Sequence, residues 1–195
     1  MSYMYDHAEV RRHAAYREAS HAVIGYWFGW LVTDEGIRID PDGYCGQCCY
    51  GRRCTREDHA HILLAGWLAE VRLAPDRCHP RTDEDLIETL NHLSDDEFAE
   101  SDDGKVLTAL KVAHPDEDTA TIIARYRWCE WVTGELLDQP HIWSVVQRIA
   151  KASIRQGQLS QDEVEKLLPD GFLLESHWWR RWFQSETERM RNQPT

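Results

Sequence analysis

A glutamate and a histidine stand three residues apart in the run Tyr16-Arg17-Glu18-Ala19-Ser20-His21-Ala22-Val23. This spacing is that of the second half of an H-E-x-x-H motif, in which two histidines one helical turn apart hold a zinc ion and the glutamate acts as a general base. The first histidine of the motif is absent, and Arg17 stands at its position. The chemistry of this stretch therefore depends on what an arginine does where a metal ligand is expected.

Arg17 cannot act as a zinc ligand, because its guanidinium stays protonated and has no lone pair to donate. A catalytic zinc site needs three protein ligands and an open position for water. His13 cannot supply the missing ligand, since it lies about 12 Å of helix rise from His21. We expect Arg17 to form a forked ion pair with Asp85 or Glu84 that links two helices in place of the metal. The alternatives are a site rebuilt with another ligand and an Arg17 that points to solvent.

A second group of candidate ligands lies in a Cys-rich loop over residues 42–56, which contains Cys45, Cys48, Cys49 and Cys54. Four thiolates, or three with a histidine, would form a closed structural zinc site. Only one C-x2-C pair is present, whereas a strong zinc signature has two. Arginines in the loop would lower the thiol pKa values, which suits metal binding or redox reactivity. Structural zinc and a loop of free thiols both fit this pattern.

The elements that must position these residues are mainly helical. Apolar residues at three- and four-residue steps, with breaks between them, predict helices over residues 8–30, 57–73, 82–93, 105–113, 117–137, 141–156, 160–168 and 175–191. Thr82 and Ser160 are predicted N-caps, the latter in a capping box. We expect a mainly α fold with a small β element, forming one domain over residues 1–195.

Three further segments carry weaker patterns. Residues 31–32 and 37–40 predict a pair of short strands joined by a turn at Asp34-Glu35-Gly36. Residues 94–104 are acidic and turn-like, and we expect a solvated, mobile loop there. The cluster His177-Trp178-Trp179-Arg180-Arg181-Trp182-Phe183 would place three tryptophans on one helical stripe. That stripe indicates docking of the last helix or, as the alternative, a patch that binds a partner.

Composition excludes several classes of function. The chain has 34 acidic and 22 basic residues and a net charge of −12, the wrong sign for a broad nucleic-acid footprint or an anionic membrane surface. The N-terminal residues do not have the pattern of a signal peptide, and no apolar run reaches the roughly 18 residues of a membrane span. No Gly-x-x-x-x-Gly-Lys phosphate loop of an ATPase module is present. We therefore expect a cytoplasmic protein.

Four stretches together resemble the peptidase domain of FtsH-type zinc metalloproteases. Residues 15–23 are similar to that family's A-Y-H-E-A-G-H-A-V, and residues 63–70 to its L-L-A-G-R-x-A-E. Residues 82–86 resemble the segment that carries the third zinc ligand, and residues 142–168 resemble the C-terminal helices. The resemblance spans about residues 13–168. It implies a stand-alone peptidase-like domain in which residues 42–56 are an insertion and residues 141–191 are the C-terminal helices.

By this resemblance, Glu18 corresponds to the general base, His21 to the second zinc ligand and Asp85 to the third, with Glu70 beside them. Arg17 in place of the first histidine implies a degenerate site, whose role becomes binding or scaffolding of a protein or peptide partner. We expect any zinc to be structural, at the Cys-rich loop, rather than catalytic. The alternatives are an active zinc metallopeptidase with a remodelled site and a metal- or redox-responsive protein that acts through residues 45–54.

Overall fold

The computed structural model describes residues 6–40, 46–51, 56–79 and 81–172. The fold is mainly α with a small antiparallel sheet, which confirms the fold class predicted from the sequence. The helices are α1 His7–Trp27, α2 Arg56–Leu73, α3 Asp83–Asn91, α4 Asp96–Glu100, α5 Asp102–Ala113, α6 Thr119–Asp138, α7 Pro140–Gln156 and α8 Gln161–Glu165, with a 3-10 turn η1 at Pro75–Arg77. The strands are β1 Leu31–Ile39, β2 Gly46–Gly51 and β3 Gln158–Leu159.

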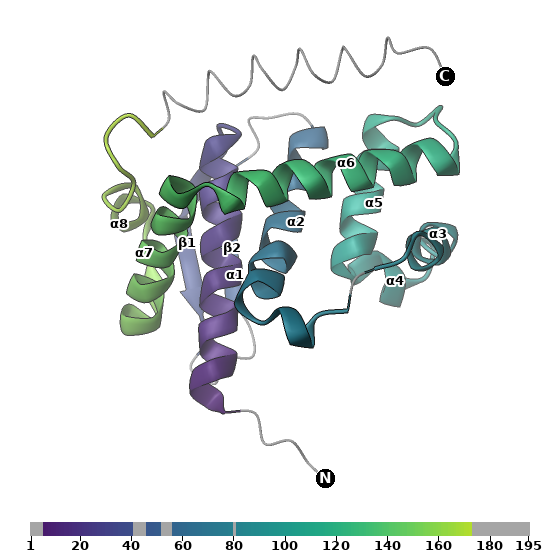
Figure 1. Ribbon diagram of the computed structural model, residues 1–195. Coiled ribbons are helices and arrows are strands. Elements are labelled where there is room, and N and C mark those ends of the chain that lie inside the picture. The colour runs from purple at the N-terminus through teal and green to yellow at the C-terminus, as the bar shows by residue number, and fades with distance from the viewer. Residues whose placement is uncertain (1–5, 41–45, 52–55, 80, 173–195) are drawn as a thin grey trace.

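Helices α1 and α2 lie side by side at the centre of the molecule. On one side of this pair, α1 packs against α7 and against the sheet, whose strand order is β2-β1-β3. On the other side, α2 packs against α5, and α6 lies across both α2 and α5 (Figure 1). Helices α3 and α4 lie beside α5, at the end of the molecule away from the sheet. The α1–α2 pair therefore joins two packed regions.

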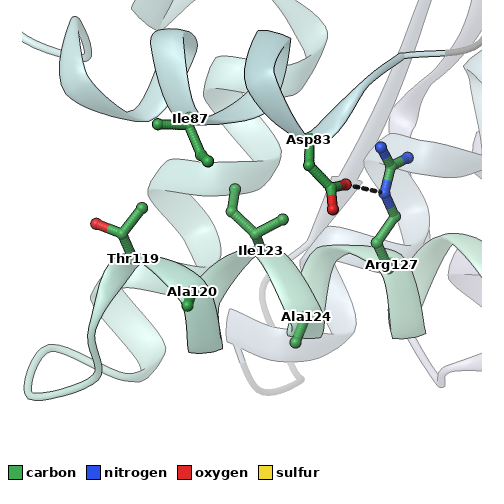
Figure 2. Close-up of a pocket in the computed structure, with 7 residues that line it drawn as sticks. All are labelled: Asp83, Ile87, Thr119, Ala120, Ile123, Ala124 and Arg127. Atoms are coloured by element: carbon green, nitrogen blue, oxygen red, sulfur yellow. Dashed lines mark hydrogen bonds and ion pairs between the residues drawn. The ribbon is translucent and has the colours of Figure 1, made fainter.

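The first hydrophobic cluster joins α2, α3, α5 and α6. It includes Leu64, Leu86, Leu107, Ile122 and Cys129, each of which is almost completely buried. Cys129 of α6 is fully buried in this cluster. Figure 2 shows where α3 and α6 meet at the surface of this region, with Ile87 of α3 above Ile123 of α6.

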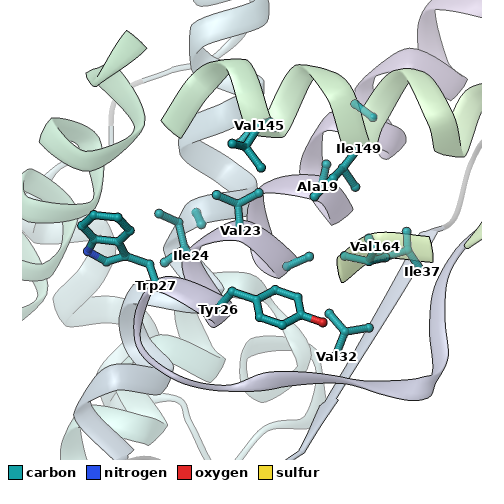
Figure 3. Packing of buried hydrophobic residues seen from close by; sticks show 14 of the residues in the cluster. Ala19, Val23, Ile24, Tyr26, Trp27, Val32, Ile37, Val145, Ile149 and Val164 are labelled. Atoms are coloured by element: carbon teal, nitrogen blue, oxygen red, sulfur yellow. The ribbon is translucent and has the colours of Figure 1, made fainter. Parts of the chain in front are cut away.

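The second hydrophobic cluster joins α1, the sheet, α7 and α8, together with residues of α2 and of the second half of α6. Val23 and Ile24 of α1 lie beside Val145 of α7 (Figure 3), and all three are fully buried. Trp27 at the end of α1 packs edge-on against Phe172, with 5.5 Å between the ring centroids. Helix α1 is thus buried along most of its last four turns, from Ala14 to Trp27, which fixes the orientation of every residue of the Arg17–His21 stretch.

The sheet differs from the prediction of two short strands around a turn, which was wrong. Residues 31–39 form one strand, β1, with an irregularity between Val32 and Ile37. Gly36 sits in that irregular stretch with a positive φ of 70°, and a Cβ there would collide with the backbone of Leu159 in β3. The turn-like Asp34-Glu35-Gly36 sequence therefore permits the close approach of a third strand.

Two predicted loops also contain regular structure. Within residues 42–56, residues 46–51 form β2, which pairs antiparallel with β1, so the prediction of an unstructured loop was wrong there. Within residues 94–104, α4 and the start of α5 replace the predicted mobile loop. Asp103 is only 5% exposed, because it lies in the first turn of α5 and faces the interior. The capping predictions at Thr82 and Ser160 are both confirmed by capping boxes.

Several predictions fall outside the described residues. The predicted last helix over residues 175–191, with its tryptophan cluster, is one of them, and Cys45 and Cys54 are others. Among the helices that the structure describes, none combines the length and the apolar character that a membrane span requires.

Candidate functional site

Arg17 joins three helices through two ion pairs. Its Nη2 donates to Oδ2 of Asp102 on α5 at 2.5 Å, and its Nη1 lies 3.4 Å from both carboxylate oxygens of Glu70 on α2. The three side chains are between 23% and 32% exposed, so the pairs lie at the mouth of the helix junction rather than in the core. The predicted pair of Arg17 with Asp85 or Glu84 was wrong, although the prediction of an ion pair that links helices was correct.

Asp102 reaches Arg17 because the residue after it anchors the start of α5. Asp103 is buried, accepts a hydrogen bond of 2.6 Å from the Tyr126 hydroxyl of α6, and forms an ion pair with Arg81. Ser101 caps the helix by accepting a hydrogen bond from the backbone of Gly104 at 3.0 Å. With the first turn of α5 fixed in this way, the neighbouring Asp102 carboxylate faces α1.

Asp85, the residue matched to the third zinc ligand, has a different role in the described structure. Its carboxylate is exposed and accepts a hydrogen bond from the backbone N–H of Thr82 at 2.9 Å, as part of the capping box of α3. That bond holds the pKa of Asp85 below its ordinary value. The carboxylate that faces the motif position is that of Asp102, which the sequence analysis did not single out. The available signal was a Ser-Asp-Asp sequence of the kind that begins helices.

His21 is held in one tautomer by α2. Its Nδ1 lies 2.6 Å from the carbonyl oxygen of Ile62, and a carbonyl can only accept, so Nδ1 carries the proton. Burial, and next the positive charge of Arg17, lower the pKa of His21 to about 4. The ring is therefore neutral at physiological pH, and Nε2 is the nitrogen with a lone pair.

Gly66 lets α1 and α2 approach closely at this point. A Cβ at Gly66 would collide with the His21 ring and would lie 2.9 Å from Cγ of Arg17. The side chains of Arg17 and His21 therefore both rest on the surface of α2 at Gly66. The Leu-Ala-Gly-Trp sequence of α2 therefore contributes to the site through the small size of its glycine, not through a reactive side chain.

Glu18 is buried between α1 and the sheet. It is 5% exposed, and burial raises its pKa to about 7, while the charge of Arg17 and a hydrogen bond from the backbone of Cys48 act in the opposite direction. Gly46, also in β2, lies so close that a Cβ there would be 2.6 Å from Cγ of Glu18. The carboxyl group therefore lies against strand β2 and changes its charge near neutral pH.

Glu18→Gln is expected to stabilise the protein at about pH 8 but not at about pH 4.5. The folded pKa of Glu18 exceeds its unfolded value, so this group favours folding below the unfolded pKa and loses that contribution as pH rises through 7. At pH 8 the buried carboxylate costs up to about 3 kcal/mol, which an uncharged glutamine avoids. Urea unfolding of both proteins across this pH range measures the difference. The pKa of His21 is shifted in the opposite direction in both proteins, so its effect cancels in the comparison. A difference in the free energy of unfolding that stayed constant with pH would contradict the burial of an ionisable Glu18.

The cysteines do not form a metal site among the described residues. Cys48 in β2 is partly buried and packs against the cluster around α1. Cys78 is also partly buried, and burial raises the pKa of its thiol. No group of three or more His, Cys, Asp or Glu side chains arranged to hold a metal occurs in the part of the chain that the structure describes. Because Cys45, Cys54 and the side chain of Cys49 lie outside that part, zinc at the Cys-rich loop stays a prediction.

The donor set at Arg17 does not fit a catalytic zinc ion. His21 offers one neutral nitrogen, but the nearby Asp102 carboxylate is already paired with a guanidinium that repels a divalent cation. A scan against models of protein families gives no match for this chain, and a search among curated proteins gives no significant one.

Proposed function

We propose that this chain is a zinc-metallopeptidase-like domain in which an ion-pair network takes the place of the catalytic metal, and that it acts as a binding or scaffolding protein. One observation carries the proposal. The guanidinium of Arg17, at the position of the first motif histidine, lies between the carboxylates of Asp102 and Glu70. The same helix still carries Glu18 and His21 at the motif spacing.

The network performs the structural part of what a metal does in such a site. A bound ion would cross-link the motif helix to the element that carries the third ligand, and Arg17 cross-links α1 to α5 and α2. Exposed ion pairs contribute little to stability, but these three groups are about three-quarters buried and one cation serves two carboxylates. Removal of Arg17 would leave two like charges facing each other at the helix junction.

The chemical part of the site is incomplete. In a zinc peptidase the general base acts on a water molecule that the ion has acidified, and Arg17 supplies no ligand for such an ion at the first motif position. Glu18 is held against β2 by the backbone of Cys48, and His21 is held against α2 by the carbonyl of Ile62. Backbone groups of β2 and α2 therefore hold both side chains in place.

The sheet supports a protein or peptide partner. Among the described strands β2 is at one end of the order β2-β1-β3, and it passes directly beside Glu18. An end strand offers backbone donors and acceptors to an extended segment of another chain. We propose that a partner in extended conformation binds at this side of the domain.

The content of bound zinc tests the proposal. Purified wild-type protein, His21→Ala and the double variant Cys45→Ser/Cys48→Ser are compared by metal analysis per chain. We expect His21→Ala to match the wild type, because no ion depends on that nitrogen. Zinc lost only from the cysteine variant would place a structural ion at the Cys-rich loop and leave the proposal intact. Zinc lost from His21→Ala would contradict the proposal and restore the enzyme alternative.

A further inference from the structure

An open apolar groove lies between α3 and α6, away from the Arg17 site. It has a volume of about 380 Å³, and Ile87 of α3 lies opposite Ala120, Ile123 and Ala124 of α6. The ion pair of Asp83 with Arg127 closes one end, as Figure 2 shows. Ile87 is 38% exposed, so the groove presents apolar surface to solvent.

The groove continues along α6 as an exposed stripe. Ala120, Ala124, Arg127 and Trp131 follow one another at steps of three and four residues, so they share one face of the helix. Trp131 is half exposed, and its ring lies 5.0 Å from that of Trp128. We call these four residues the outer stripe of α6. A half-exposed tryptophan in line with an apolar groove is the surface expected of a docking site.

We propose that the C-terminal segment of the same chain, residues 173–195, occupies the groove and the outer stripe. Its sequence carries Trp178, Trp179 and Trp182, which a helix places on one side, with Leu174 one turn before them. These side chains match the apolar groove and the exposed ring of Trp131. Burial of each of these side chains would stabilise the docked segment about as much as burial of a side chain in the core stabilises the fold.

Charge favours this occupant. Arg180 and Arg181 lie in a stretch, residues 176–185, that has no acidic residue. The groove is bordered by α3, which has four acidic residues and no basic one, and by the acidic run Asp116-Glu117-Asp118 before α6. The one cation in the groove, Arg127, is already paired with Asp83 and Glu130 among the described residues.

The length of the segment and its starting point also fit. Phe172 packs on Trp27, whose ring centroid lies 6.3 Å from that of His141. His141 follows the end of α6 by three residues. A helix over residues 175–191 would be about 26 Å long, and α6 is about 30 Å long. The segment therefore starts near the C-terminal end of α6 and is long enough to reach the groove near its N-terminal end.

Trypsin cleavage after Arg180 and Arg181 in the full-length chain tests the proposal, with each cut identified by mass. We expect slow cleavage in the wild type and at least about tenfold faster cleavage in Ala124→Arg, which places a bulky cation in the groove, because cleavage follows the population of the undocked state. Trp131→Ser and Trp182→Ser should release the segment in the same way. Ala8→Arg, a matched change at another exposed alanine, should leave the rate unchanged.

Two results would overturn the proposal. Equal cleavage rates in wild type, Ala124→Arg and Trp131→Ser would show that the segment does not occupy this surface. Protection that increases with protein concentration would show that the segment docks on a second copy of the chain. Neither test depends on zinc, so this inference can fail while the proposed function stands.

Discussion

Arg17→His is expected to create a zinc site at this position. The change restores two histidines one helical turn apart on α1, and it frees the Asp102 carboxylate that the guanidinium holds. His21 already has its proton on Nδ1 and its lone pair on Nε2, which is the tautomer that binds metal. We expect the apparent zinc affinity to rise by more than about 100-fold. Titration with zinc against a competing chelator measures it.

Four control variants separate this site from others. Arg17→Gln removes the charge without adding a ligand and should gain no zinc. Arg17→His/Asp102→Asn and Arg17→His/His21→Ala should lose most of the gain, whereas Arg17→His/Asp85→Asn should keep it. Zinc that depends on Asp85 rather than Asp102 would show that the alignment with the third ligand was correct and that the helices rearrange around the metal.

Gly66→Ala is expected to lower the free energy of unfolding by about 2 kcal/mol, although alanine is the better helix former. The added methyl group would collide with the His21 ring, which its hydrogen bond to Ile62 holds in place, and would press on Cγ of Arg17. Overpacking costs about 1–3 kcal/mol, and the collision of a Cβ with Nε2 of His21 lies at the upper end of that range. Subtracting the roughly 1 kcal/mol that alanine gains over glycine in a helix leaves a net loss of about 2 kcal/mol. Urea denaturation of the two proteins provides the comparison.

Gly134→Ala is the matched control, because a Cβ at this other helical glycine meets no atom within 4 Å among the described residues. There we expect a gain of about 0.5–1 kcal/mol. Opposite signs for two identical substitutions would locate the close contact of α1 and α2. Stabilisation by both would mean that the helices are farther apart at Gly66 than the structure has them.

Local sequence signals predicted most of the described helices, although they missed α4 and the start of α5. The periods of α6 and α7 gave their extents to within about two residues, and the caps at Thr82 and Ser160 follow from hydrogen bonds that span only three residues. The strands were harder, because the partner of β1 lies in a Cys- and Gly-rich stretch without alternation and its other partner is two residues long. Pairing between such segments depends on tertiary contacts that no local pattern records.

The candidate site was predictable only in part, for the same reason. Arg17, Glu18 and His21 share one helix, so their spacing is visible in the sequence. Asp102 is 85 residues from Arg17, in a run of acidic residues that looked solvated. The burial of Asp103 against Tyr126 helps to distinguish that run from a surface loop, and that contact joins two different helices.

The position of α7 late in the chain has a consequence for synthesis on the ribosome. Helix α1 buries its apolar face against α7, and β1 completes its sheet with β3, which follows α7. Translation proceeds at about 5–20 residues per second, so α1 waits roughly 6–25 s for α7 to emerge about 120 residues later. During that interval the nascent chain presents side chains such as Val23 and Ile24 to solvent, where a chaperone that recognises apolar segments would bind them. Production of this protein should therefore depend on chaperone capacity more than its modest size suggests.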